Sequence, residues 1–296
     1  MSFAYDPSGG PIVCADGAEV LTYSPIDEHP LWRRVLEALI VSVGTTSRQV
    51  FTLEASGQLA VWDGPSGAFI GGARVAPARA LAVSAQGTCA IATADAIAIV
   101  DAQGTRSLPI ARAAALTFAA DGRMLGVAGD DGRVLVVEIT TGATALSATL
   151  PGAVTSVAPH PDGAWFATSG DAIFRVERSG EVARVTGLGG QIAQRVVCSQ
   201  DGRLLGLQLS GKTAVVLAYP SRDTVASFSY MDRAVLGIAF GPPRVIFGVG
   251  LDKGDGNKID LHAETVSRTD THPGRTHNRW ALKAGFETGV LARALA

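Results

Sequence analysis

The stretch AADGRMLGVAGDDGRVLVVEITTG, Ala119–Gly142, decides the fold class of this chain. Asp121-Gly122 and Asp131-Gly132 are candidate two-residue hairpin turns, because Asp and Gly tolerate the positive φ angles that such turns need. MLGVAG and RVLVVE, between and after them, are apolar, partly β-branched and too short for stable helices. A third turn at Thr140–Gly142 precedes ATALSATL, a more polar segment suited to an outer strand. The stretch therefore predicts four short strands joined by tight turns.

The same punctuation repeats along the whole chain. The first turn of the unit recurs at intervals of 38, 40, 35, 41, 39 and 41 residues, at Gly9, Ser47, Gly87, Gly122, Gly163, Gly202 and Pro243. A second turn follows each of these after 8 to 13 residues. A period near forty with four strands per unit is the pattern of a propeller blade. The sequence predicts an all-β fold, a seven-bladed β-propeller of four-stranded antiparallel blades with a short C-terminal tail.

The segment before each first turn also repeats, as ALIVSV, ALAVSA, ALTFAA, VTSVAP, RVVCSQ and LGIAFG. Large apolar residues alternate there with small ones. Small side chains suit the innermost strands of a propeller, which converge around a crowded axis. These segments are therefore expected to form the inner strand of each blade.

Two motifs resemble those of WD-repeat blades. LAVWD, Leu59–Asp63, ends a predicted third strand with the Trp-Asp dipeptide, and HPDG, His160–Gly163, stands where such repeats turn from the first strand to the second. Degenerate dipeptides follow at Val100-Asp101, Val137-Glu138 and Val176-Glu177. The Gly-His dipeptide that often opens a WD repeat is absent. The resemblance covers roughly residues 1–272 and implies a WD-repeat-like propeller.

Residues 1–272 are thus expected to form the propeller and residues 273–296 a C-terminal tail. The first unit already holds four strands of its own, whereas the last unit weakens after KIDLHAETV, so the tail is left over. RWALKA, Arg279–Ala284, could donate a closing strand. The tail could instead dock as a short helix through its apolar residues, although Gly285 and Gly289 would destabilise that helix. These apolar residues are Phe286, Val290, Leu291 and Leu295.

Composition narrows the possible partners and compartment. A net charge of −2 with no long basic run does not favour nucleic acid or an anionic membrane as a partner. Neither a secretory signal nor a membrane span is visible. Cys14, Cys89 and Cys198 fall in predicted strands, and their odd number argues against a disulfide framework and for a reducing cytosol. The excess of arginine, 21 against 4 lysines, suggests a GC-rich genome, and a bacterial-type cytoplasmic protein is expected.

The sequence contains no recognisable catalytic or metal-binding motif. It has neither a G-x-S-x-G elbow nor a phosphate-binding glycine loop. Its C-terminal fifth gathers three histidines and several aspartates, but their spacing matches no compact ligand pattern. DKGDGNKID has glycine where a calcium loop needs its second oxygen ligand. The histidines and aspartates of this C-terminal fifth are His262, His272, His277, Asp252, Asp255, Asp260 and Asp270. We therefore expect no catalytic residue, no metal and no cofactor.

Recognition by surface remains, and THPGRTHNRW, Thr271–Trp280, is the candidate segment, because tryptophan and arginine often dominate binding energy. The alternative is that Trp280 packs on the last blade and Arg279 caps a turn. Trp62 is expected in the core between blades, while Trp32 fits either role. The predicted partner-binding residues are Arg275, His277, Asn278, Arg279 and Trp280.

These observations predict a non-catalytic scaffold that binds other protein subunits of a cytosolic multiprotein assembly. Rigid blades would hold many loops on one rim and present a preorganised surface. The alternative is an enzyme or small-ligand binder that uses the axial funnel. Carboxylates, histidines or a metal at the axis would favour the alternative, whereas alanine, serine and backbone would favour the scaffold.

Overall fold

The repeating hairpins form as the sequence predicts. The computed structural model of the chain describes residues 2–5, 10–24, 30–210, 213–229, 233–241, 244–251, 259–265 and 279–284. In the stretch that decides the fold, Gly122 and Gly132 have φ angles of 70° and 88°, which few other residues adopt without strain. The carboxylate of Asp121 accepts a hydrogen bond from the backbone N–H of Arg123 at 2.9 Å and fixes the turn.

The strands assemble into four-stranded antiparallel sheets, each built from four strands consecutive in sequence, and we call these sheets blades 1 to 7. Blade 1 contains β1 (Ser2–Tyr5), β2 (Ile12–Asp16), β3 (Glu19–Tyr23) and β4 (Pro30–Val35). Blade 2 contains β5 (Ile40–Thr45), β6 (Gln49–Glu54), β7 (Gln58–Asp63) and β8 (Phe69–Arg74). Blade 3 contains β9 (Ala78–Val83), β10 (Cys89–Thr93), β11 (Ile97–Asp101) and β12 (Gly104–Leu108). Blades 4 and 5 contain β13 (Ala113–Phe118), β14 (Met124–Gly129), β15 (Arg133–Glu138), β16 (Thr144–Thr149); β17 (Val154–Pro159), β18 (Trp165–Ser169), β19 (Ala172–Val176), β20 (Val182–Gly187). Blades 6 and 7 contain β21 (Ala193–Cys198), β22 (Leu204–Leu209), β23 (Thr213–Ala218), β24 (Thr224–Ser229); β25 (Arg233–Gly241), β26 (Arg244–Leu251), β27 (Ile259–Thr265), β28 (Arg279–Ala284).

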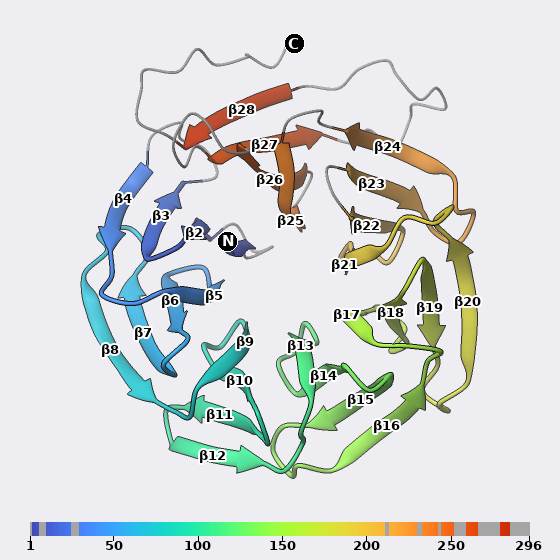
Figure 1. Ribbon diagram of the computed structural model, residues 1–296, viewed down its shortest axis with the longest axis horizontal. Helices are drawn as coiled ribbons and strands as arrows, with labels where there is room; N and C mark the ends of the chain where they lie inside the picture. The colour runs from blue at the N-terminus through green and yellow to red at the C-terminus, as the bar shows by residue number, and fades with distance from the viewer. Residues whose placement is uncertain are drawn as a thin grey trace.

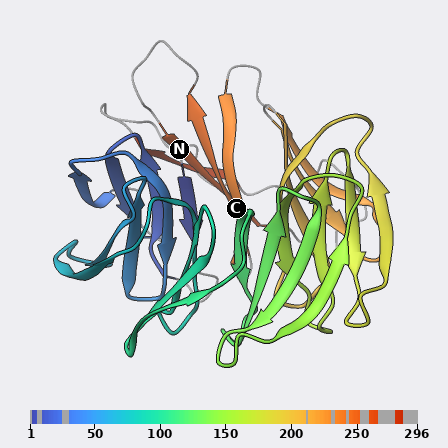
Figure 2. The same cartoon turned by 60° about the horizontal axis from the view of Figure 1, so that its bottom comes forward.

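The blades are arranged radially around one axis (Figure 1). The first strand of each blade lies beside the axis, and the fourth lies on the perimeter. The view tilted by 60° shows the strands of each blade running through the thickness of the ring (Figure 2). The turns between strands therefore gather on its two rims, as the sequence predicts for a propeller.

The prediction of seven equivalent repeats needs correction, and of the two alternatives for the tail the strand at Arg279–Ala284 is confirmed. Blades 1 to 6 follow the repeat, with strands of four to six residues. The last sheet departs from it, because β25, β26 and β27 have nine, eight and seven residues. Its outer strand β28 comes from beyond residue 272 and pairs antiparallel with β27, from Ile259 opposite Ala284 to Glu264 opposite Arg279. The regular propeller repeat thus describes six blades, and the seventh sheet is a divergent unit completed from the predicted tail. Phe286, Val290, Leu291 and Leu295, which the helical alternative needed, lie outside the described residues.

Apolar side chains fill the spaces between adjacent blades. Between blades 4 and 5, the Trp165 ring of β18 covers Gly126 of β14, where a Cβ atom would come within 2.3 Å of the ring. Val127 and Leu125 of β14 are 2% and 0% exposed and pack instead against blade 3. Blade 4 therefore buries its two faces against blades 3 and 5, which no isolated sheet could do.

The three cysteines lie in strands, as the sequence predicts. Cys14 in β2 and Cys89 in β10 are buried, Cys198 at the end of β21 is half-buried, and all three are free thiols. Burial raises the pKa of the Cys89 thiol to about 12. No helix of the described part is long and apolar enough to cross a bilayer.

Candidate functional site

The predicted partner-binding residues fall largely outside the described ranges. Arg275, His277 and Asn278 lie outside them, while Arg279 and Trp280 begin β28. The backbone of β28 places Arg279 opposite Glu264 and Trp280 opposite Ala263. The interpretation of these five residues as partner contacts stays a prediction.

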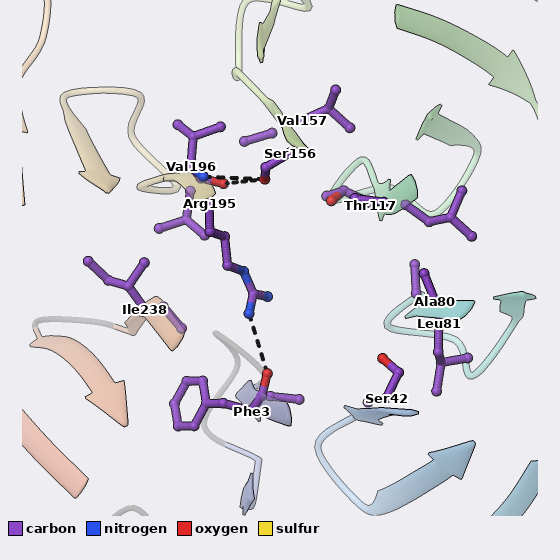
Figure 3. A pocket seen from close by; sticks show the side chains of 18 of the residues that line it. Phe3, Ser42, Ala80, Leu81, Thr117, Ser156, Val157, Arg195, Val196 and Ile238 are labelled. Atoms are coloured by element: carbon purple, nitrogen blue, oxygen red, sulfur yellow. Dashed lines mark hydrogen bonds between the residues drawn. The ribbon is translucent and has the colours of Figure 1, made fainter. Parts of the chain in front are cut away.

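The axial funnel is a real cavity, with a volume of about 440 Å³, lined by the inner strands of all seven blades. Small and apolar side chains, hydroxyl groups and backbone make up most of the described lining. It contains no carboxylate and no histidine, and its one charged side chain is that of Arg195 in β21 (Figure 3). Within the described residues, no group of three His, Cys, Asp or Glu side chains is close enough to hold a metal ion.

Sequence reasoning missed Arg195. It treated RVVCSQ as one more inner strand and noted only the alternation of large and small residues. A register comparison of the inner strands was the signal that could have revealed it, because arginine there replaces a small residue.

A second feature lies on the perimeter, where Trp32, Arg34, Trp62 and Phe69 form what we call the perimeter cluster. The rings of Trp32 and Trp62 are 6.4 Å apart, and those of Trp62 and Phe69 are 5.4 Å apart in an edge-on arrangement. The Arg34 guanidinium lies 5.1 Å from the centre of the Trp62 ring, within reach of a cation–π interaction. The contact between Trp32 of β4 and Trp62 of β7 therefore joins blades 1 and 2.

Hydrogen bonds fix the orientation of the perimeter cluster. The Trp32 indole donates to the carbonyl of Gly64 at 2.7 Å, and the Arg34 Nε donates to the carbonyl of Gly67 at 2.9 Å. The Trp62 indole donates to the Thr52 hydroxyl at 3.0 Å. Trp62 is only 8% exposed, so its predicted place in the core between blades is confirmed. Trp32 is half-buried and has a structural role at the same interface.

Exposed apolar side chains concentrate on the same two blades. Among described residues, the large hydrophobic side chains that remain exposed are Leu31 (40%), Val35 (69%), Leu39 (66%), Phe69 (61%), Ile70 (53%) and Ile192 (50%). All but Ile192 belong to β4, to the segment that follows it, or to β8. Sequence reasoning missed this concentration, because an outer strand with apolar residues reads like any other strand until its exposure is known.

Blades 5 and 6 are joined differently, by a polar network around the predicted HPDG turn. His160 Nε2 lies 3.1 Å from the carbonyl of Gly202, and Arg175 of β19 donates to the Tyr219 hydroxyl at 3.1 Å. Arg175 also pairs with Asp162 and Glu177, at 2.6 Å each. Every polar group in this network has a structural partner, so His160 acts in packing here.

The comparisons with known proteins agree with this geometry. The WD40 family model (WD domain, G-beta repeat) matches residues 145–176, which run from β16 through β19 and include the HPDG turn. The beta-propeller domain of Myceliophteria thermophila Cps50 (Swd1) is similar in structure, with a TM-score of 0.72 and 14% identity over 88% of this chain and 94% of that one. A chain in the crystal structure of the mitotic checkpoint complex has a TM-score of 0.70 and 16% identity over 83% and 82% of the two chains. No curated protein sequence matches the chain. The predicted resemblance is thereby confirmed: one unit of the chain matches the WD40 repeat model, and the similar solved structures share its β-propeller fold.

Proposed function

We propose that this propeller is a non-catalytic scaffold that binds other protein subunits of a cytosolic multiprotein assembly. The observation that carries the proposal is the concentration of exposed apolar side chains on β4 and β8. Aromatic and apolar residues exposed beside arginines are the composition of binding hot spots. Phe69, 61% exposed and packed at one edge against the buried Trp62, is held in place before any partner arrives. Little ordering entropy would be lost on binding.

Two further observations support the scaffold. Apart from Arg195, the described lining of the axial channel consists mainly of apolar side chains, hydroxyl groups and backbone, which suits a scaffold. The structurally similar chain in the mitotic checkpoint complex is, by that name, a component of a complex. The proposal extends such a role to this chain.

The test is a pair of matched surface variants. Phe69→Ser combined with Ile70→Ser removes the exposed apolar pair on β8, and Ile192→Ser removes an equally exposed side chain far from it. Tagged wild-type and variant chains would be purified from the native host, and their co-purifying proteins quantified and cross-linked. The β8 variant should lose a specific partner that Ile192→Ser retains, with cross-links mapping to blades 1 and 2. Equal partner recovery by both variants contradicts a docking role for β8.

The predicted C-terminal contact stays part of the proposal as a second docking element. Arg275, His277, Asn278, Arg279 and Trp280 combine donors with a large aromatic, which suits a protein partner. Trp280→Ala should reduce partner recovery while the melting temperature stays unchanged. If it instead lowers the melting temperature, Trp280 packs within the last blade.

A further inference from the structure

Arg195 breaks the internal symmetry of the axial channel. Six inner strands carry a bulge against their second strand, so the residue just after the bulge is structurally equivalent in each. This position holds Ser42, Ala80, Ala115, Ser156, Arg195 and Gly237. Five of these residues have small side chains, as crowding at the axis requires. An arginine at the sixth is not explained by packing.

The guanidinium of Arg195 is poorly supported by the protein around it. Nη1 donates to the carbonyl of Phe3 across the channel at 3.4 Å, near the upper limit for a hydrogen bond (Figure 3). No carboxylate of the described residues pairs with it, although a guanidinium offers five N–H donors. Removal from water lowers the pKa of Arg195. Arg195 is half-buried and lines the channel, so its remaining N–H donors are available to a ligand there.

The contact with Phe3 does not explain the arginine as a clamp for the first strand. β1 is already held by four antiparallel pairs with β2 and by the Val43 N–H, which donates to the Ser2 hydroxyl at 3.1 Å. The Phe3 ring also packs against Gly237 of β25, where a Cβ atom would come within 2.7 Å of it. One long hydrogen bond adds little to these contacts.

The space in front of Arg195 suits a small polar ligand. A volume of about 440 Å³ would hold about 15 water molecules at ~30 Å³ each. The hydroxyls of Ser42 and Thr117 face the same space (Figure 3), and neither has a hydrogen-bond partner among the described residues. One planar cation with neutral hydroxyls around it matches a single negative charge. A carboxylate can accept two parallel N–H bonds from such a guanidinium, whereas a phosphate dianion would need further positive charge.

We propose that the axial channel binds one carboxylate group, held by two hydrogen bonds from the Arg195 guanidinium and by the Ser42 and Thr117 hydroxyls. The carboxylate belongs either to a small free acid or to an acidic side chain that a partner inserts into the channel. The site is independent of the apolar surface on β8.

Binding is tested by titrating the 296-residue chain with acetate, succinate, inorganic phosphate and a short peptide carrying one aspartate, followed by calorimetry and by NMR of the arginine side chains. Wild-type chain should bind a carboxylate saturably and more tightly than phosphate. Tighter binding of the free acids identifies a small ligand, and tighter binding of the peptide identifies an inserted side chain. Absence of saturable carboxylate binding overturns the proposal.

Variants assign the binding to the channel. Arg195→Ser should weaken it at least about tenfold and should fold, since serine occupies the same position in blades 2 and 5. Arg195→Lys keeps the charge without the planar fork and should weaken binding by a smaller factor. Arg184→Ser removes a perimeter arginine that is 58% exposed and should bind like wild type. Equal binding by Arg195→Ser and Arg184→Ser overturns the proposal, while a Phe69→Ser, Ile70→Ser chain should bind the carboxylate normally whatever its effect on protein partners.

Discussion

Arg175 Nη2 lies 2.6 Å from Asp162 Oδ2, and this ion pair connects β19 to the turn between β17 and β18. The Arg175 side chain is 16% exposed and also donates to the Tyr219 hydroxyl of blade 6. Burial alone would raise the pKa of the Asp162 carboxyl. Hydrogen bonds from Arg175, from the Ala164 N–H and from His160 outweigh that effect and hold this pKa well below its usual range. The ion pair therefore belongs to the contact between blades 5 and 6.

Replacing Asp162 with asparagine should destabilise the propeller by about 1 kcal/mol, because Arg175 keeps Glu177 as a partner and the Asp162 side chain is 46% exposed. Asp171→Asn is the matched control. Asp171 Oδ1 lies 3.8 Å from Arg184 Nη2, and the side chains of Arg184 and Asp171 are 58% and 50% exposed, so this ion pair should contribute less. Urea unfolding at neutral pH measures both variants. A larger loss for Asp171→Asn than for Asp162→Asn would contradict this ranking.

The same carboxyl predicts an acid-dependent stability. The folded pKa of Asp162 is lower than the unfolded one, so its contribution is complete above the unfolded value near 4 and is lost as the pH falls towards the folded value. Wild type should lose stability relative to Asp162→Asn between about pH 5 and pH 2. Melting temperatures measured across this range check the prediction, and parallel curves for the two chains would refute it.

Gly126 should tolerate no larger residue. A Cβ atom there would lie 2.3 Å from the Trp165 ring, so Gly126→Ala should cost about 1–3 kcal/mol through overpacking between blades 4 and 5. Gly71 in β8 has open space around the equivalent atom, and Gly71→Ala should change stability by less than about 0.5 kcal/mol. Denaturant unfolding of the two variants compares them directly. Equal losses would show that strand glycines are needed for their backbone and not for space.

Trp62 and Thr52 should be strongly coupled in their contributions to stability, because the Trp62 indole donates a hydrogen bond to the Thr52 hydroxyl. Thr52 is fully buried, so Thr52→Val leaves the indole N–H without its acceptor and should cost about 1–3 kcal/mol. Trp62→Phe removes the donor, and the hydroxyl then loses its partner. The double variant should lose less than the sum of the two single losses, as a double-mutant cycle would show. Additive losses would mean that the bond contributes nothing beyond packing.

The fold was predictable because its signals are local. Gly122, Gly132 and their counterparts mark turns at fixed spacing, and the spacing alone implies equivalent sheets. The seventh sheet departs from the pattern because β25, β26 and β27 are longer than the other strands and a long connection separates β27 from β28. Site residues were less accessible, since the exposure of Phe69 and the position of Arg195 depend on how blades pack and on the register after a bulge. Neither quantity has a signature in a single strand.

The three thiols should be inert in the native propeller, although the chain contains no disulfide that could protect them. Burial raises the pKa of Cys89 and of Cys198 to about 12, so the reactive thiolate form is scarce at pH 8. Burial also raises the pKa of Cys14. A thiol-exchange reagent at pH 8 should therefore react only as fast as the protein opens, and three equivalents should react at once in denaturant. Cys198 is the most exposed of the three, so Cys198→Ser supplies the control. A fast reaction of one thiol in the wild type that disappears in this variant would show that the end of β21 opens locally beside the channel.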